Sequence, residues 1–488
     1  MLFTSLEFFV FLPLTLLVFA LVDLRWRWAW LLLASWIFYG AGHPAYLVYL
    51  GAVTIAVCAL GWGIERAAGG GRVALLIAGI VALAGALLAF KFYDFAAGEI
   101  ERLVRTTAQG RSLTLPRLGI GAPAGFSFYV FSALSYLIDI YVRRIPGKQN
   151  AVDVALYLAF FPKILAGPIE RAPTFLSQLG SRVSWDPACV VLGLQLIVWG
   201  LFKKAVIADN LAPVVDHNFA IAAFATPIEL LISVYFFAFQ IYCDFSGYTD
   251  IAIGTALLFG IRLMENFRRP YLSRSTAEFW GRRWHISLGR WFRDYLYIPL
   301  GGSRAGLLRQ YASTMIVFVV SGLWHAGLGY GVGWTFVVWG ALNGLYQWIG
   351  LATRPLWHRL GDAWPRIAAS VPLAVLRVLL TFHLIAVTWV FFRAKSIGDA
   401  WLILKKIGTN LAAMPSLVPA YPFTAEHAFG AAMIVLLLVV EIFDERRSVF
   451  ARLAAAPIVL RWSVYYVAIL GLLILGRWQV TEFIYMQF

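Results

Sequence analysis

One histidine stands alone in a long apolar stretch of the chain. His325 is the only Asp, Glu, Lys, Arg or His between Gln310 and Thr353. As a helix, the sixteen residues from Arg309 to His325 would span roughly 24 Å, which is most of the about 30 Å of hydrocarbon in a bilayer. An ionisable side chain at that depth is a functional-site hypothesis by default, and a neutral imidazole can act as general base for an attacking hydroxyl. The alternative is a buried histidine held by a backbone carbonyl, and spacing alone weighs the two evenly.

The residues after His325 are unlike a helix. They read Ala-Gly-Leu-Gly-Tyr-Gly-Val-Gly up to Gly333. Alternating glycines disfavour a continuous helix. A broken backbone at membrane depth is tolerated only where it is buried in protein or lines a wet cavity. The sequence therefore predicts a break in the helix beside His325, either buried in protein or lining such a cavity.

Composition places the chain in a membrane. Of its 488 residues, 61% are hydrophobic and only 13% are charged, whereas about a quarter of a soluble domain is charged. The first apolar run, 6–22, carries Glu7 where a signal peptide would be basic, so we expect a retained transmembrane helix. The net charge of +15 lies in clusters between apolar runs. That pattern indicates cytosolic loops and contact with anionic lipid rather than nucleic-acid binding.

The apolar runs predict an all-α polytopic protein with about eleven to thirteen membrane-embedded helices. The long runs are 6–22, 45–63, 73–93, 189–208, 227–243, 310–325, 332–352, 370–392, 428–443 and 458–476. The shorter runs, which could be half-helices, re-entrant segments or tilted spans, are 28–40, 118–141, 152–166 and 250–263. No repeat and no separate soluble domain is visible, so residues 1–488 are expected to form one integral-membrane domain.

Basic clusters give the expected orientation. Lys203 and Lys204, with the clusters at 25–27, 143–148 and 262–309, are the best candidates for cytosolic loops. The N-terminus would then face outside. The three cysteines, Cys58, Cys189 and Cys243, have no CxxC spacing, so neither a disulfide framework nor a zinc site is predicted.

The stretch 262–309 holds ten arginines and an aromatic stripe. The stripe consists of Trp280, Trp284, Leu288, Trp291 and Tyr295, at helical spacing. Opposite it lie Glu278, Arg282 and Arg293, with His285 at the edge between the two faces. This pattern predicts an interfacial amphipathic helix over 276–298. The arginines suit a membrane anchor, and the alternative is a docking surface for a polyanionic donor.

Several polar side chains lie inside apolar runs and need partners. They are Asp139, Lys163, Gln240, Asp244, Ser246, Tyr248 and Asp250. Gln240, Asp244 and Tyr248 share one helical stripe, and Ser246 and Asp250 share another. Structural ion pairs and hydrogen bonds between helices are favoured over catalytic roles for this set.

A series of short motifs, in order from about residue 120 to the end, resembles the membrane-bound O-acyltransferase superfamily. The motifs occupy 125–129 with 134–139, 160–169, 200–209, 240–250, 266–271, 279–287, 291–302, 321–325, 389–394 and 483–488. The resemblance is to the bacterial branch of alginate O-acetylation and teichoic-acid D-alanylation proteins. It implies a ring of tilted helices around a thin centre, with an outer funnel and a cytosolic tunnel. The catalytic core would cover 118–345, flanked by helices in 1–117 and 346–488.

The same resemblance implies site residues. His325 maps to the family's catalytic base, and His285 to its second His or Asn, which would orient the thioester or stabilise the oxyanion. Donor-binding or tunnel roles are expected for Trp284, Ser287, Arg290, Arg293, Asp294, Tyr297, Trp324 and Asn343. Two departures are the glycine-laced segment 325–334 and Asn343, where a histidine is more usual. If 276–298 is interfacial, His285 and His325 can meet only where that segment dips into the membrane or the bilayer is thinned.

The implied activity is an O-acetyltransferase of the bacterial inner membrane with many crossings. It would pass an acetyl group from cytosolic acetyl-CoA, or from an acyl-carrier thioester, to an exopolysaccharide or another cell-envelope glycan. A periplasmic SGNH-type partner would complete the transfer, and no permanently bound cofactor or metal is expected. The alternatives are carrier-dependent D-alanyl transfer and a non-enzymatic transporter or export component.

Overall fold

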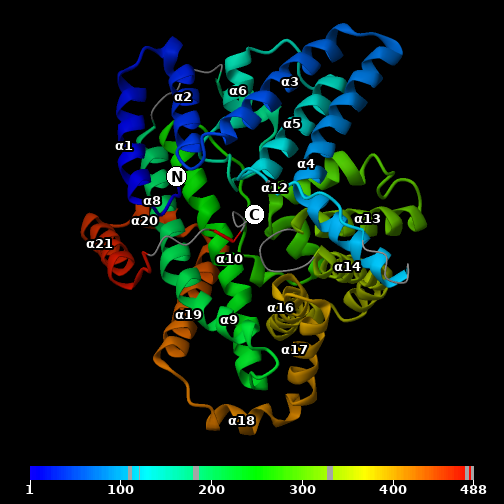
Figure 1. The fold of residues 1–488 in the computed structure, drawn as a ribbon. Coiled ribbons are helices and arrows are strands. Elements are labelled where there is room, and N and C mark those ends of the chain that lie inside the picture. Colours follow the sequence, from blue (N-terminus) through cyan, green and yellow to red (C-terminus); the bar gives the residue numbers. More distant parts are fainter. Residues whose placement is uncertain (108–112, 120, 180–185, 327–332, 479–482, 485–488) are drawn as a thin grey trace. The chain divides into compact units, whose positions relative to one another are not determined.

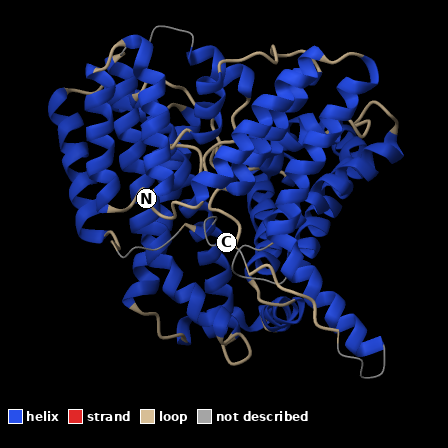
Figure 2. Cartoon of the chain, turned by 45° about the horizontal axis from the view of Figure 1, so that its top comes forward, coloured by secondary structure: helices blue, strands red, loops and turns tan. Residues whose placement is uncertain are grey.

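The computed structural model describes residues 1–488 except 108–112, 120, 180–185, 327–332, 479–482 and 485–488. The described residues form helices joined by loops and contain no strand (Figure 2). The predicted all-α class is confirmed. A helix satisfies its backbone hydrogen bonds internally, which an apolar solvent requires. The glycine-rich segment that follows His325 lies outside the described residues.

Eight described helices are long and apolar enough to cross a membrane. They are Tyr46–Arg66, Gly69–Thr107, Pro187–Ala220, Pro227–Leu258, Leu307–His325, Val371–Arg393, Ala425–Arg446 and Ile458–Leu475. Three further apolar helices are shorter: Leu6–Leu21, Phe126–Tyr141 and Leu411–Ala420. The chain is thus a multi-pass membrane protein.

The chain folds into two compact units, each built from segments that are distant in sequence. The first unit holds residues 1–197 and 248–264, and the second holds 198–247 and 265–484. Two of the boundaries fall inside helices, in α8 (Pro187–Leu201) and α10 (Pro227–Leu258), and a third lies between residues 264 and 265, after α10 has ended. Both histidines of the predicted site belong to the second unit.

The first unit is a helical bundle in which α3, α4 and α5 pack on one another and α2 packs on α6. Its helices are α1 (Leu6–Leu21), η1 (Leu24–Trp26), α2 (Arg27–Gly40), α3 (Tyr46–Arg66), α4 (Gly69–Thr107), α5 (Phe126–Tyr141), α6 (Ala151–Ala159) and α7 (Ala172–Leu179). The expected run 152–166 is helical only as far as Ala159 and continues as buried turns.

The second unit contains the helices that surround His325. Its first part comprises the π-helical turn η2 (Phe202–Ala208), α9 (Asp209–Ala220), η3 (Pro270–Leu272), α11 (Thr276–Glu278), η4 (Phe279–Arg283), α12 (Ile286–Phe292) and η5 (Arg293–Tyr297). Its second part comprises α13 (Leu307–His325), α14 (Gly333–Ala363), α15 (Pro365–Ala368), α16 (Val371–Arg393), α17 (Ile397–Thr409), η6 (Leu411–Ala413), α18 (Met414–Ala420), α19 (Ala425–Arg446), α20 (Val449–Ala454) and α21 (Ile458–Leu475).

Two sequence predictions about helices are wrong for the same reason. The runs 227–243 and 250–263 are one continuous helix, α10, up to Leu258. Lys203 and Lys204 are not in a loop, because they are buried in η2, within the helical stretch Pro187–Ala220. The polar residues within these two helical stretches have partners: Lys204 contacts Asp244, and Lys203 donates to Ser246. Buried charges that are paired do not force a helix to end.

The predicted amphipathic helix over 276–298 is also wrong as a continuous element. The segment consists of α11, η4, an extended residue at Trp284, a left-handed residue at His285, α12 and η5. A residue with positive φ cannot continue a right-handed helix. The predicted faces are nevertheless correct, since Trp284, Leu288 and Trp291 are buried while Arg282 and Arg293 are exposed.

α13 and α14 form a close antiparallel pair, which positions His325 (Figure 1). Their axes approach so closely that two glycines are required at the contact. A Cβ on Gly322 would lie 2.3 Å from the carbonyl oxygen of Phe336, and one on Gly340 would lie 2.4 Å from that of Phe318. Small residues of this kind permit tight helix packing where no hydrophobic force from water drives it.

We expect Gly322→Ala to lower the free energy of unfolding by about 1–3 kcal/mol, because the added methyl group overpacks the α13–α14 contact. Unfolding of the purified protein in detergent measures this. The matched control is Gly350→Ala, which lies on the partner helix α14 with open space around its Cα. Its free energy of unfolding is expected to be unchanged or to rise by about 0.5–1 kcal/mol. Equal stabilities of the two variants would contradict the close approach.

Candidate active site

The two predicted histidines come together in the buried part of the second unit. Each side chain is buried, with 3% of its surface exposed. The ring of Trp324 contacts both, with its centroid 4.7 Å from that of His325 and 6.2 Å from that of His285. The predicted interfacial segment therefore does turn inward, at the break between Trp284 and His285.

The backbone at the end of α13 determines which nitrogen of His325 is the acceptor. At the end of α13, its Nδ1 lies 2.6 Å from the carbonyl oxygen of Ser321. A carbonyl oxygen only accepts, so Nδ1 carries a proton and the neutral ring has its lone pair on Nε2. The sequence left open that His325 is only a buried histidine held by a backbone carbonyl. That contact is present, but it uses Nδ1, and a general base would act through Nε2. The ring centroid lies 5.0 Å from that of Trp339 and 5.7 Å from that of Phe392.

Asn266 holds His285 in its unusual conformation. The backbone at His285 is left-handed, with φ of 43° and ψ of 54°, which is costly for a residue other than glycine. The fully buried Oδ1 of Asn266 accepts hydrogen bonds from His285 Nδ1 at 3.0 Å, Ser287 N at 3.2 Å and Ser287 Oγ at 2.9 Å. The backbone also pairs here, since Ile286 N donates to Asn266 O at 2.9 Å.

These contacts define the tautomer of His285. The Ser287 amide can only donate, so the Asn266 atom that it meets is the oxygen, and His285 Nδ1 must donate to that oxygen as well. Burial lowers the pKa of His285 well below its usual value, and the nearby His325 lowers it further. His285 is therefore neutral at neutral pH, with its proton on Nδ1 and a lone pair on Nε2.

Asn266 is a site residue that sequence reasoning did not single out. It stands nineteen residues before His285, and it falls in one of the family-like motifs, 266–271. No local spacing connects the two positions. The signal in the sequence that could have indicated Asn266 was its place in the motif, because a polar residue in such a motif calls for a structural explanation.

Four tryptophans, Trp280, Trp284, Trp339 and Trp389, form a tryptophan cluster beside His325. Their rings contact one another, with centroids 5.4 Å apart for Trp280 and Trp339 and 4.9 Å apart for Trp284 and Trp389. Trp339 and Trp389 stack at 6.0 Å and 20°. Such a cluster excludes water and lowers the local polarity around the histidine.

Hydrogen bonding in the tryptophan cluster is uneven. Trp280 Nε1 donates to Asn343 Oδ1 at 2.9 Å, and Asn343 Nδ2 donates to the Trp339 carbonyl at 2.8 Å. By contrast, the Nε1 atoms of Trp339 and Trp389 are buried and have no hydrogen-bond partner among the described residues. Buried donors of this kind are rare and require an explanation.

The residues expected to bind the donor fall into two groups. Trp284, Ser287, Trp324 and Asn343 are buried, and the contacts above join them to the histidines or to the tryptophan cluster. The others lie toward the surface: Arg290 and Arg293 are exposed, Asp294 and Tyr297 are half-buried, and Arg293 contacts Asp294 at 2.9 Å. The structure does not bring this second group to the histidines.

The expected polar core divides between the two units. In the second, Lys204 contacts Asp244 at 2.7 Å and Asp209 at 2.9 Å, and Lys203 donates to Ser246 at 3.0 Å. Gln240 is also buried there. These contacts are the structural pairs that the sequence led us to expect.

In the first unit, Asp139 binds Arg144 at 2.9 Å. The ammonium of Lys163 lies 4.7 Å from the centre of the Tyr157 ring. Asp250 is half-buried. Among the described residues, no group of three or more His, Cys, Asp or Glu side chains is arranged to hold a metal ion.

A polytopic helical protein with a buried histidine pair and a water-excluding aromatic cluster has the features of a membrane-embedded transferase. Sequence comparison agrees. A model of the membrane-bound O-acyltransferase family matches residues 128–391, more than half of the chain. The chain belongs to this family, and it is an O-acyltransferase.

Its relatives include enzymes of different cell-envelope polymers. It is 38% identical to the probable alginate O-acetylase AlgI of Azotobacter vinelandii, over 80% of this chain and 75% of that one. It is 34% identical to the peptidoglycan O-acetyltransferase of Helicobacter pylori, over 78% and 74%. The teichoic acid D-alanyltransferase of Bacillus subtilis is more distant, at 22% identity over 56% and 68%.

We expect Asn266→Ala to lower the free energy of unfolding by about 1–3 kcal/mol, because buried donors lose their shared acceptor. Ser287→Ala removes one of those donors and keeps the acceptor, so its effect should be clearly smaller. Denaturant unfolding of both variants in detergent gives the comparison. An Asn266→Ala protein as stable as wild type would show that Asn266 does not hold the turn.

Proposed function

We propose that this protein transfers an acetyl group from cytosolic acetyl-CoA, across the bacterial inner membrane, for the O-acetylation of a cell-envelope polysaccharide. The observation that carries the proposal is the meeting of two buried histidines, His285 and His325, from segments forty residues apart. Both lie in the stretch matched by the family. The alginate and peptidoglycan relatives support acetyl as the group transferred and a glycan as its destination.

In this mechanism His325 is the general base. Its Nε2 takes the proton of the accepting hydroxyl, and the oxygen attacks the thioester carbonyl carbon. The tetrahedral intermediate then collapses, the carbon–sulfur bond breaks and the thiolate takes the proton back from His325. The reaction is balanced without an added proton or a covalent enzyme intermediate. The hydrogen bond from Nδ1 to the Ser321 carbonyl keeps the ring oriented and stabilises the imidazolium as it forms.

Of the two roles that the family position of His285 suggests, orientation of the substrate fits this geometry and stabilisation of the oxyanion does not. A neutral ring with its proton on Nδ1 offers only an acceptor at Nε2, so it cannot donate to an oxyanion. Its geometry instead suits the orientation of a substrate N–H or O–H group. Asn266 fixes this choice, because it occupies the protonated nitrogen.

The donors to the oxyanion are then the indole N–H groups of Trp339 and Trp389. Both are buried and have no hydrogen-bond partner among the described residues. The Trp339 ring contacts His325 directly, and Trp389 stacks on Trp339. A preorganised donor in a water-excluded site is worth far more than one in water. We propose that one or both hydrogen-bond to the thioester carbonyl oxygen as negative charge develops on it.

Acetyl-CoA as donor is supported by charge. Arg282, Arg290 and Arg293 are exposed on the segment that contains His285. Guanidinium groups suit the phosphates of coenzyme A. The runner-up is carrier-dependent D-alanyl transfer, for which the teichoic-acid relative is the support. Such an enzyme would not turn over acetyl-CoA.

The last step is proposed to need a periplasmic SGNH-type acetyltransferase, which passes the acetyl group to the polymer. A transporter or export component is the alternative from another class. A transporter should show corresponding broken helices in two halves of the chain. A non-enzymatic component of an export complex should keep its assembly and phenotype when His325 is replaced by Ala.

The first experiment measures hydrolysis and transfer from radiolabelled acetyl-CoA by the purified protein in detergent, with and without a periplasmic partner. We expect His325→Ala to lose at least about a hundredfold in rate. Arg447→Gln, an exposed arginine elsewhere in the second unit, should retain wild-type turnover. If wild type does not use acetyl-CoA under either condition, the donor assignment fails and carrier-linked acyl transfer takes its place.

The role of the indole N–H groups is tested by replacing Trp339 or Trp389 with benzothienylalanine, whose sulfur keeps the ring shape and removes the donor. We expect kcat to fall by about 10²-fold at the position that binds the oxyanion. The same replacement at the exposed Trp462 controls for incorporation. If the wild type is active and kcat is unchanged at both buried positions, the indole N–H groups do not bind the oxyanion. That result would leave the proposed role of His325 as base unaffected.

A further inference from the structure

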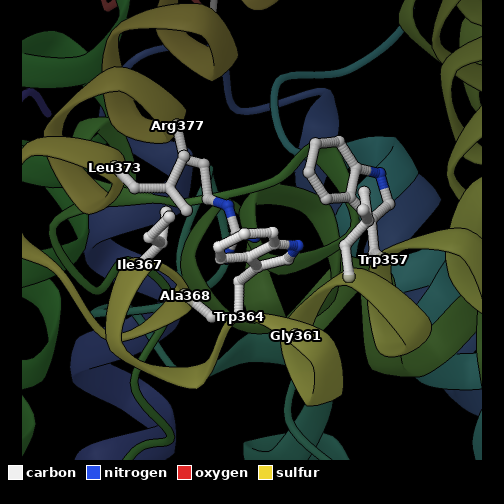
Figure 3. Close-up of a pocket in the computed structure, with 8 residues that line it drawn as sticks. Trp357, Gly361, Trp364, Ile367, Ala368, Leu373 and Arg377 are labelled. Atoms are coloured by element: carbon white, nitrogen blue, oxygen red, sulfur yellow. The ribbon is translucent and has the colours of Figure 1, made fainter.

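An apolar hollow lies apart from the histidine site, where the end of α14, α15 and the start of α16 meet. Its volume is about 320 Å³. Figure 3 shows Trp357, Trp364, Ile367, Leu373 and Arg377 around it. No residue of the tryptophan cluster and neither histidine lines it. The hollow therefore needs an explanation of its own.

The register of α13 against α14 places this hollow beyond the end of a membrane span. Trp348 Nε1 donates to the Tyr311 carbonyl at 2.8 Å, so these two residues are level. Leu307, where α13 begins, is then level with about residue 352, and α14 continues from there to Ala363. The part of α14 that projects past α13 contains Trp357.

The charge pattern marks the same boundary. The stretch from Gln310 to Thr353 contains no Asp, Glu, Lys or Arg, and charged side chains resume at Arg354. Tryptophan and arginine gather at the level of lipid headgroups. The hollow thus lies where acyl chains meet the headgroup layer.

The surroundings of the hollow are basic. Arg377, half-buried, lines it. Arg354, Arg359 and Arg366 are exposed on the chain segments that form it, against one acid, Asp362. The Arg377 guanidinium lies 5.2 Å from the centre of the Trp357 ring. That contact holds the charge at the rim, over an otherwise apolar wall.

The apolar side chains that line the hollow are too exposed for protein alone to cover them. Trp364 is 61% exposed, Ile367 55% and Trp357 51%. In a membrane protein, lipid covers such surface. A soluble phosphate would satisfy the arginines but would leave the apolar wall open, and a zwitterionic lipid would not use the excess positive charge.

We propose that this hollow binds one anionic phospholipid of the phosphatidylglycerol type. An acyl chain lies in the hollow between Trp357, Trp364 and Ile367, and the phosphate and its headgroup meet Arg366 and Arg377. Basic pockets at the membrane surface bind anionic headgroups in this way, through charge-assisted hydrogen bonds. The site does not depend on the proposed acetyl transfer.

The test is thermal unfolding of the detergent-purified protein with phosphatidylglycerol, with phosphatidylcholine of the same chains, and with glycerol 3-phosphate. We expect phosphatidylglycerol alone to raise the unfolding midpoint saturably, since a ligand of the folded state stabilises it. The double variant Arg366→Gln/Arg377→Gln should weaken the apparent affinity by about tenfold or more. Arg447→Gln, which changes one exposed arginine elsewhere, should keep the wild-type response.

A response to phosphatidylcholine equal to that with phosphatidylglycerol would overturn the headgroup assignment, and an equal response to glycerol 3-phosphate would overturn the lipid. A double variant with wild-type affinity would overturn the location. Should the double variant not fold, native mass spectrometry of Trp364→Ala and wild type decides. We expect wild type to retain one phosphatidylglycerol and Trp364→Ala to lose it, and equal retention would contradict the site.

Discussion

The hydrogen bonds that Asn266 Oδ1 accepts are the contacts on which the candidate active site depends. They hold His285 in a left-handed conformation that a side chain other than glycine rarely adopts. In this conformation, the chain turns inward and the ring faces Trp324 and His325. The same oxygen determines which nitrogen of His285 is protonated, so one side chain controls both position and chemistry.

A second constraint is the pairing of charge inside apolar surroundings. Lys204 with Asp244 and Asp209, and Lys203 with Ser246, bury two lysines in a π-helical turn. Breaking such a pair leaves an uncompensated charge, which typically costs about 3–5 kcal/mol. The pairing therefore ties η2 to α10 and to Ile484, whose backbone N–H donates to Asp244 at 2.8 Å. These groups stabilise the second unit, in which the histidines lie.

The tryptophan cluster joins packing to chemistry. Its rings exclude water from His325, which strengthens every electrostatic interaction nearby. Its indole N–H groups differ: that of Trp280 donates to Asn343, whereas those of Trp339 and Trp389 are buried without a partner among the described residues. A cluster built only for packing would be expected to satisfy its buried donors. The oxyanion role proposed above accounts for these two donors.

The sequence by itself determined the class of the protein, the helix that ends at His325 and the buried face of 276–298. Those properties follow from composition and from periodicity, which report burial and are local to a segment. The family-like motifs added the expected pairing of His285 with His325. Tertiary structure alone decided that the segment breaks at Trp284 and His285, that Asn266 holds the break, that Lys203 and Lys204 are buried, and that α10 is continuous. Each of these depends on a hydrogen bond or ion pair between residues far apart in the chain. Local periodicity cannot encode such contacts, because the partner that satisfies a buried polar group is chosen by the packing of other helices.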